Sequence, residues 1–233
     1  MAGWNATCAS RALRLLGAFA AGLSLTTLLA QSGSDLGYTS RVSALLKAQF
    51  TQKFGAGTPD RIEDWIRQGR SPGAARKPNV PDTELLRAVN GYFNRVKYVE
   101  DQKHWGEQDY WATPLEMVAS NGGDCEDYAI AKYYLLKELG MPIGRLRITY
   151  VKALKLNQAH MVLAYYASTG ADPLILDNLE DQIRPASERP DLDPVYGFND
   201  DEVELAKTGQ KGVPTQLRAW QTVQGRLRAQ SRT

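Results

Sequence analysis

The spacing of apolar residues predicts helices through the first half of the chain. Apolar positions recur at helical intervals over 35–54 and 59–68, which is typical of amphipathic helices. A third helix is predicted to begin at Asp82, a residue type that caps helix N-termini well, and to run to about Phe93. The segment 69–81 is rich in Gly, Pro and basic residues, which predicts an exposed loop before that third helix.

Two further helices are predicted on either side of an Asn-Gly-Gly-Asp sequence at 121–124. The stretch 94–110 is polar and aromatic without a regular period, and we expect irregular structure there. The sequence Thr-Pro-Leu-Glu at 113–116 then has the residues of a capping box, with Pro at the first helical position. The second helix covers 125–139 and ends at a Gly-Met-Pro sequence, because Gly favours the left-handed cap and Pro cannot continue the helix.

After this helix the pattern changes to short runs that are typical of β-strands. The runs 146–151, 160–166 and 173–177 are rich in β-branched and aromatic residues and are separated by polar loops, which predicts successive antiparallel strands. The segment beyond Arg184 is rich in Pro and Asp and predicts a loop, and 216–228 predicts a closing amphipathic helix. Helices followed by a strand meander predict an α+β fold, with a helical N-terminal part packed on an antiparallel sheet.

The first 32 residues differ in character from the rest. Arg11 and Arg14 precede an uncharged apolar run at 15–30, and small residues follow at a plausible cleavage position. This pattern predicts a secretory signal peptide over 1–32 and a single exported domain over 33–233. The alternative is an uncleaved membrane anchor, since a run of about 20 residues can span a bilayer. Either reading places the body of the protein outside the cytoplasm, and we expect the periplasm.

Length and charge limit the classes of function. The chain has 233 residues, of which 43% are hydrophobic and 23% charged, which is enough for one domain with a real core. Removal of residues 1–32 takes away two arginines and no acid, so the formal net charge falls from +2 to 0. A neutral body lacks the basic surface that nucleic-acid binding requires.

Cys125 is the only cysteine in 33–233, because Cys8 lies in the leader. Exported proteins usually pair their cysteines, so a single cysteine there is a candidate reactive thiol; a structural, buried cysteine is the alternative. Cys125 falls in the first turn of a predicted helix, where backbone N–H groups and the positive end of the helix dipole stabilise a thiolate. Its own N–H is a natural oxyanion donor, and the preceding Gly-Gly leaves room for a substrate backbone.

A thiol nucleophile needs a base, and the chain has two histidines. His104 lies in the stretch expected to be irregular, whereas His160 begins a predicted strand and is therefore better placed. Asp177, at the end of the next strand, can orient the imidazole by accepting a hydrogen bond from its other nitrogen. Taken singly, His160 can be an ordinary core or surface residue and Asp177 an ordinary turn residue. Together with Cys125 they indicate a Cys-His-Asp triad.

Asp124, Glu126 and Asp127 surround the candidate nucleophile. A tight carboxylate cluster suits a hard cation, and without a counter-ion it would oppose formation of the thiolate. Acids at a helix N-terminus also simply complement the dipole, and the residues alone leave both interpretations open. A second acidic run, at 199–202, is interpreted as a helix cap and solvated face.

Three segments together resemble the bacterial transglutaminase-like cysteine proteinases. They are Asn-Gly-Gly-Asp-Cys-Glu-Asp-Tyr-Ala at 121–129, the strand that begins at His160, and Leu-Asp-Asn at 176–178. The resemblance extends over about 82–207, and the Gly-Asp-Cys-Glu-Asp segment is its most specific part. It implies a papain-like α+β core with Cys125 as nucleophile, His160 as base and Asp177 as orienting acid. It also implies dependence on Ca²⁺, with Asp124, Glu126 and Asp127 as the expected ligands.

The resemblance further implies a substrate and a regulator. Periplasmic members of this kind cut the N-terminal retention region of a large surface adhesin at a small-residue site, and so control biofilm release. Their inhibitory partner is an inner-membrane cyclic-di-GMP receptor that sequesters the protease. Two other functions stay open: a transglutaminase or cell-wall amidase that uses the same triad, and a non-enzymatic calcium-binding adaptor in which Cys125 is structural.

Overall fold

The structure is a computed structural model that describes residues 38–70 and 80–232. The predicted signal peptide, 1–32, and most of the predicted loop at 69–81 lie outside the described residues. Within the described ranges, no helix combines the length and the apolar character that a membrane crossing needs.

The helices follow the predicted pattern with two differences. The first predicted helix is divided into a 3₁₀ turn and α1, and a short helix, α4, lies in the stretch expected to be irregular. The α-helices are α1 (Ala44–Phe54), α2 (Thr58–Arg70), α3 (Asp82–Phe93), α4 (Asp101–His104), α5 (Pro114–Ser120), α6 (Cys125–Glu138) and α7 (Arg218–Gln230). The 3₁₀ turns are η2 (Tyr38–Arg41), η3 (Ile143–Arg145), η4 (Ala186–Glu188) and η5 (Pro214–Gln216).

The strands form one large antiparallel sheet and one two-residue parallel pair. The large sheet has the order β6-β5-β4-β3-β7-β8-β9, and the pair is β1-β2. The strands are β1 (Lys97–Tyr98), β2 (Gly122–Gly123), β3 (Leu146–Ala153), β4 (Gln158–Tyr165), β5 (Leu174–Leu176), β6 (Arg184–Pro185), β7 (Leu192–Phe198), β8 (Val203–Leu205) and β9 (Lys211–Gly212). The predicted α+β class and the three predicted strands are confirmed.

The predicted loop beyond Arg184 is wrong, because that segment contains β6 to β9. Strand β7 pairs antiparallel with β3, and its Pro194 lies opposite Val151, where the register shifts. A bulge of this kind accommodates a proline that a regular ladder would not. The acidic run at 199–202 is the turn between β7 and β8 and not a helix cap: the Asn199 side chain accepts the backbone N–H of Asp201 and of Glu202.

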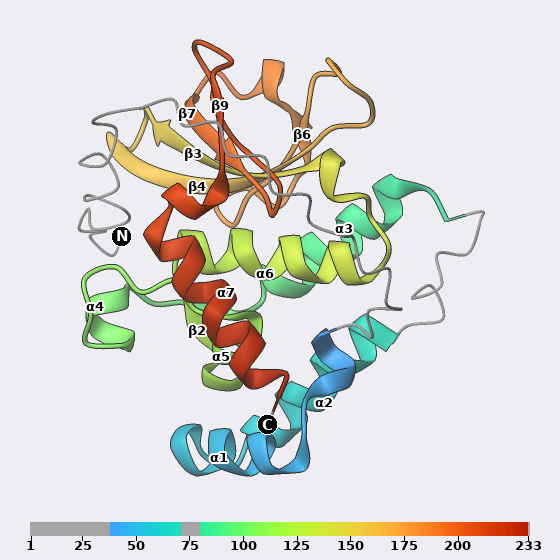
Figure 1. Cartoon of the computed structure of the whole chain (residues 1–233), viewed down its shortest axis with the longest axis vertical. Coiled ribbons are helices and arrows are strands. Elements are labelled where there is room, and N and C mark those ends of the chain that lie inside the picture. Colours follow the sequence, from blue (N-terminus) through green and yellow to red (C-terminus); the bar gives the residue numbers. More distant parts are fainter. Residues whose placement is uncertain (1–37, 71–79, 233) are drawn as a thin grey trace, which may run out of the picture.

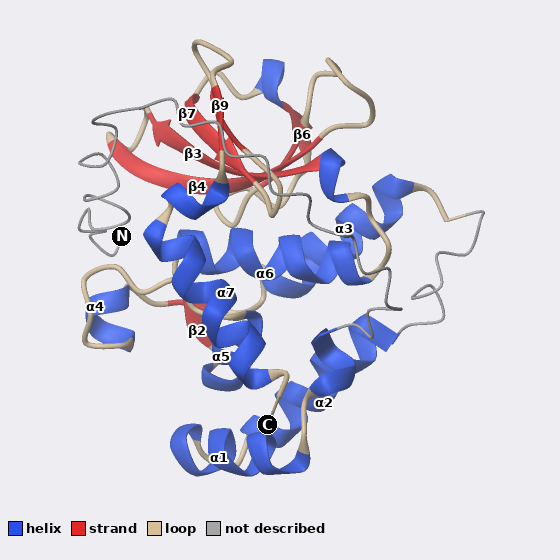
Figure 2. Ribbon diagram, viewed as in Figure 1, coloured by secondary structure: helices blue, strands red, loops and turns tan. Residues whose placement is uncertain are grey.

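Helix α6 lies at the centre of the molecule, between the sheet and the other helices (Figure 1). It packs against β4 and β3 on one side and against α3, α5 and α2 on others. The helices and the sheet therefore form separate layers that meet along α6 (Figure 2). Because α6 is covered all round, it is buried on nearly every side, including at Tyr133 and Leu136. This central position fixes both ends of α6 relative to the sheet.

Local caps fix where the two helices before and at the candidate nucleophile begin. At α5 the Thr113 side chain accepts the Glu116 N–H at 3.2 Å, and Glu116 accepts the Thr113 N–H at 2.7 Å, so the predicted capping box is present. At α6 the N-cap is Asp124, and the Asp127 side chain accepts the Asp124 N–H at 3.3 Å. Helix α6 consequently begins at Cys125 itself.

Candidate functional site

Cys125 is the first residue of α6, and the N-cap residue Asp124 separates it from strand β2, Gly122–Gly123. Both glycines are required by the packing of the protein itself. A Cβ on Gly123 would lie 2.7 Å from an Asp127 oxygen, and a Cβ on Gly122 would lie 2.7 Å from the ring of His104. The sequence suggested that these glycines leave room for a substrate, but at both positions the space is filled by side chains of this chain.

His160, on β4, and Asp177, directly after the neighbouring strand β5, form a buried pair. Extending the β4–β5 register by one residue places Asp177 opposite Val162, diagonal to His160 on the same face of the sheet. The His160 Nε2 lies 2.8 Å from the Asp177 Oδ1, and neither side chain is more than 2% exposed. With Nε2 donating to Asp177, Nδ1 is the nitrogen that can exchange a proton with a nucleophile.

The Asp177 carboxylate has two further donors. Arg189 Nη2 lies 2.9 Å from Oδ2, and the Leu179 N–H donates to Oδ1 at 3.0 Å. Burial opposes ionisation of this carboxyl, but hydrogen bonds and charge from His160, with the Leu179 N–H and Arg189, hold the pKa of Asp177 well below its usual range. Asp177 is therefore an anion that can stabilise an imidazolium at His160. Arg189 was not predicted as a site residue.

His104 has a different environment. Its Nε2 lies 2.8 Å from the Ser120 hydroxyl, and within the described ranges it forms no ion pair with a carboxylate. Burial and the nearby charge of Lys53 lower the pKa of His104. Of the two histidines, His160 is thus the one with an acid partner, and its strand β4 packs directly against α6, the helix that Cys125 begins.

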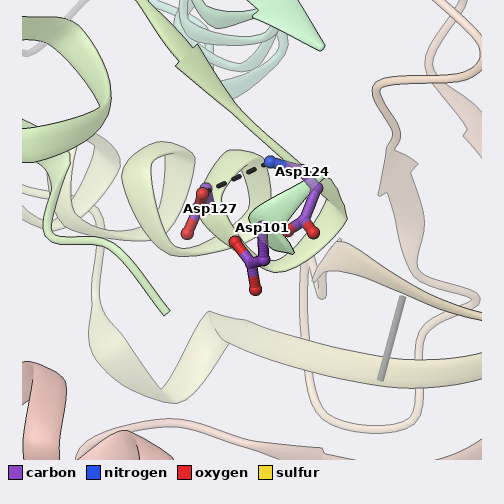
Figure 3. A group of neighbouring side chains, drawn as sticks. All are labelled: Asp101, Asp124 and Asp127. Carbon is purple, nitrogen blue, oxygen red and sulfur yellow. Dashed lines mark hydrogen bonds between the residues drawn. The ribbon is translucent and has the colours of Figure 1, made fainter. Parts of the chain in front are cut away.

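A carboxylate cluster lies at the start of α6, beside Cys125. One oxygen each of Asp101, Asp124 and Asp127 lie within 4.8 Å of one another, and Asp101, Asp109 and Glu126 form an overlapping group. Figure 3 shows Asp101, from α4, reaching the two aspartates at the start of α6. The structure therefore brings together all three predicted acids and adds Asp101 and Asp109, which the sequence analysis missed.

Asp109 is exposed, but the other four carboxyl groups are buried with little compensation from the chain. No lysine or arginine in the described ranges forms an ion pair with Asp101, Asp124 or Asp127. Burial, followed by repulsion from neighbouring acids, raises the pKa of Asp101 to about 8. Burial likewise raises the pKa of Asp124 to about 7, and it holds those of Glu126 and Asp127 well above their usual range.

Oxygen atoms in this cluster are oriented for a ligand that the chain does not supply. Asp101 Oδ1 and Asp124 Oδ1 are buried and have no hydrogen-bond partner among the described residues. Ca²⁺ binds oxygens at roughly 2.3–2.6 Å, so two ligand atoms of one ion can be up to about 5 Å apart. The carboxylate oxygens of each group lie within 4.8 Å of one another, which is inside that limit. The residues present therefore fit a hard divalent cation.

The cluster also contacts the candidate nucleophile. Cys125 Sγ lies 3.1 Å from Glu126 Oε2. Asp127 serves the fold as well, because its Oδ1 accepts the Ala112 N–H at 2.6 Å while its other oxygen caps α6. The acids thus connect three segments: α4, the residues directly before α5, and the start of α6.

Comparison with known proteins places this arrangement in a family. Residues 68–191 match the family described as bacterial transglutaminase-like cysteine proteinase. Among solved structures, EGTA-treated LapG of Legionella pneumophila is 37% identical, with a TM-score of 0.69 over 82% of this chain and 97% of that one. Calcium-bound LapG of the same organism is 38% identical, with a TM-score of 0.67 over 82% of this chain and 99% of that one. No match was found among curated proteins.

Proposed function

Because the chain belongs to the bacterial transglutaminase-like cysteine proteinases, we propose that it is a calcium-dependent endopeptidase with a triad of Cys125, His160 and Asp177. The observation that carries this proposal is the buried His160–Asp177 hydrogen bond, on the strand that packs against the helix begun by Cys125. A nucleophile at a helix start, a base and an orienting acid are the parts that acyl transfer needs.

The catalytic cycle follows from these three groups. Asp177 accepts a hydrogen bond from His160 Nε2–H, so Nδ1 takes the thiol proton and leaves a thiolate that attacks the scissile carbonyl carbon. The Cys125 N–H, at the first position of α6, is the donor for the oxyanion. The carbon–nitrogen bond then breaks, and the imidazolium gives its proton to the leaving amine. Water, deprotonated by His160, hydrolyses the acyl-enzyme and releases a carboxylate and the free thiol.

The residues that would hold Ca²⁺ are Asp101, Asp124, Glu126 and Asp127, with Asp109 at the edge of the cluster. A bound ion would supply positive charge beside Cys125, which would otherwise face carboxylates that oppose its ionisation. The similarity to LapG in calcium-bound and EGTA-treated forms supports this assignment.

The substrate and regulation are proposed from the same likeness. We infer that the protein acts in the periplasm on the N-terminal retention region of a large surface adhesin and so releases cells from a biofilm. We infer also that an inner-membrane cyclic-di-GMP receptor is its inhibitory partner. The signal-peptide pattern at 1–32 supports export, and the similarity to LapG supports the type of enzyme.

The test is cleavage of a purified adhesin N-terminal segment under three conditions. The protein is assayed with Ca²⁺, with EGTA, and as the Cys125→Ser variant with Ca²⁺, and products are identified by mass spectrometry. We expect one discrete cut, with a new carboxylate and a new amino terminus, only with Ca²⁺ and an intact Cys125. Substitution of the nucleophile should lower the rate by at least about a thousandfold.

Other results would reject parts of the proposal. An isopeptide product would indicate a transglutaminase, and cleavage by Cys125→Ser at a rate close to that of the wild type would reject the triad. Cleavage that is equally fast in EGTA would leave the acids as helix caps only. Binding of the adhesin segment without cleavage under any condition would favour the adaptor.

A further inference from the structure

Arg189 connects the candidate acid to a second carboxylate. Its Nη2 lies 2.9 Å from Asp177 Oδ2 and 3.0 Å from Asp191 Oδ2, and its Nε lies 3.1 Å from Asp191 Oδ1. The side chain is only 7% exposed. Hydrogen bonds between a buried guanidinium and carboxylates are strong and directional. The Asp177 carboxylate is thus held from both sides, by His160 at Oδ1 and by Arg189 at Oδ2.

This connection crosses the end of the sheet. Asp177 follows β5, whereas Arg189 and Asp191 directly precede β7, and strands β4 and β3 lie between β5 and β7. The Asp191 carbonyl also accepts the Leu154 N–H at 2.8 Å, in the turn that joins β3 to β4. That turn leads directly into the strand that carries His160. Arg189 therefore ties the acid to the same end of the sheet from which the base projects.

We propose that Arg189 is a positioning residue that fixes the Asp177 carboxylate so that Oδ1 faces His160 Nε2. The inference rests on the proposed function, because it concerns the orientation of the triad. His160 and the Leu179 N–H both contact Oδ1, so an aspartate held only at that oxygen can still rotate, and its hydrogen bond to the imidazole then weakens. The charge-assisted bond from Arg189 at Oδ2 removes that freedom.

Other polar and charged groups also lie near Asp177, and their effect must be compared with that of Arg189. Lys132, on α6, is 1% exposed, and its charge acts on Asp177 and Asp181. Asn94, on α3, donates to the Asp177 carbonyl at 2.9 Å and to the Asp181 carboxylate at 2.7 Å. Arg189 is the cation that contacts the Asp177 carboxylate directly. Its loss should therefore change the orientation of Asp177 more than the loss of the more distant Lys132 charge.

The test measures the reactivity of Cys125 without any peptide substrate. The rate of alkylation by iodoacetamide is followed from pH 4 to 9 in reduced, calcium-loaded protein, for the wild type, Arg189→Met and Arg189→Lys. Arg147→Met is the matched control. Arg147, on strand β3, is also largely buried and ion-paired, but its partner is Glu202, in the turn between β7 and β8. Cleavage of the adhesin segment gives kcat and KM for the same proteins.

We expect Arg189→Met to reduce alkylation near pH 6 and kcat by about tenfold, the factor expected for one charge-assisted hydrogen bond. KM should stay within about twofold, since no substrate contact is lost. Arg189→Lys should recover part of both rates, because the charge remains. Arg147→Met should match the wild type in both assays.

Two outcomes would overturn the proposal. One is a folded Arg189→Met protein whose alkylation profile matches the wild type; the other is a loss of alkylation that Arg147→Met reproduces. If Arg189→Met does not fold, Asp191→Asn, which loosens Arg189 without removing it, should cause a smaller loss in the same direction, and no loss would reject the role. A shifted alkylation profile in a protein that cleaves no adhesin would reject the proposed substrate and retain the positioning role.

Discussion

Two groups of buried carboxylates in this protein have opposite electrostatic environments. Asp177 is 1% exposed and Asp124 is 3% exposed, so burial alone does not distinguish them. Asp177 accepts hydrogen bonds from His160 and Arg189, and its pKa is far below the usual range. Asp124 has a buried oxygen without a partner among the described residues and neighbours that are also acids, and its pKa is raised to about 7.

The difference indicates at which of the two sites the chain itself balances the buried negative charge. Asp177, the acid of the proposed triad, is balanced by a cation and a histidine of this chain, whereas the cluster at the start of α6 concentrates negative charge that no described lysine or arginine offsets. An uncompensated buried charge is costly. We therefore expect the proposed triad to keep its arrangement in the absence of metal, and the acidic cluster to need a bound cation to keep its own.

The largest effect is expected from a substitution of Asp177, the carboxylate that His160 and Arg189 balance. Asp177→Asn leaves the shape of the site intact but cannot stabilise an imidazolium, so kcat should fall by about a thousandfold or more. Steady-state cleavage of the adhesin segment measures this, with circular dichroism to establish folding. A loss of less than about tenfold would show that Asp177 does not act as the orienting acid.

The acidic cluster at the start of α6 should make the stability of the protein depend on pH when metal is absent. The raised pKa values of Asp101 and Asp124, about 8 and 7, mean that the folded state holds protons that the unfolded state has released above about pH 4. In EGTA, stability should therefore decrease as pH rises from 5 to 8, by on the order of 5 kcal/mol. Chemical unfolding at several pH values measures this. Rising stability over that range would contradict the raised pKa values.

Calcium should offset part of that loss. At a concentration of a hundred times Kd, the ion should stabilise the folded protein by about 2.7 kcal/mol, seen as a higher Tm at pH 7.5. Asp124→Asn should abolish the calcium-dependent increase and, in EGTA, be at least as stable as the wild type because it removes one repelling charge. Glu204→Gln, a matched loss of one acid on β8, should keep the full calcium response.

The smallest effect is expected at Lys132, a buried cation on α6 whose Nζ has no hydrogen-bond partner among the described residues. Burial lowers the pKa of Lys132 to about 7. Below its unfolded pKa near 10.5, Lys132 therefore destabilises the folded protein, and the full cost is reached below about pH 7. Lys132→Met should stabilise the protein by about 2 kcal/mol at pH 6, and the gain should shrink as pH rises toward 10.5. Urea unfolding at pH 6 and pH 9.5 tests this. A destabilised variant at pH 6 would mean that the charge of Lys132 is needed by the fold.

The sequence predicted the parts of the site that depend on local signals. The start of α6 at Cys125 follows from its cap. The strand that carries His160, and the strand that ends just before Asp177, follow from their β-rich composition. The residues that were missed are brought in by long-range packing: Asp101 from α4, and Arg189 from the segment before β7. Neither has a local pattern that indicates a role. Strand β7 was missed because its Pro and Asp content resembles a loop, and only the pairing with β3 accommodates it.

The most direct test of the contrast is isothermal titration of Ca²⁺ into the Cys125→Ala protein, which cannot cleave itself or a substrate. We expect one ion per chain, with binding lost in Asp124→Asn and in Asp101→Asn and retained in Arg189→Met. This result would show that the acidic cluster is completed by calcium and that the triad is completed by the chain. The absence of binding, or binding that neither aspartate substitution affects, would contradict the account.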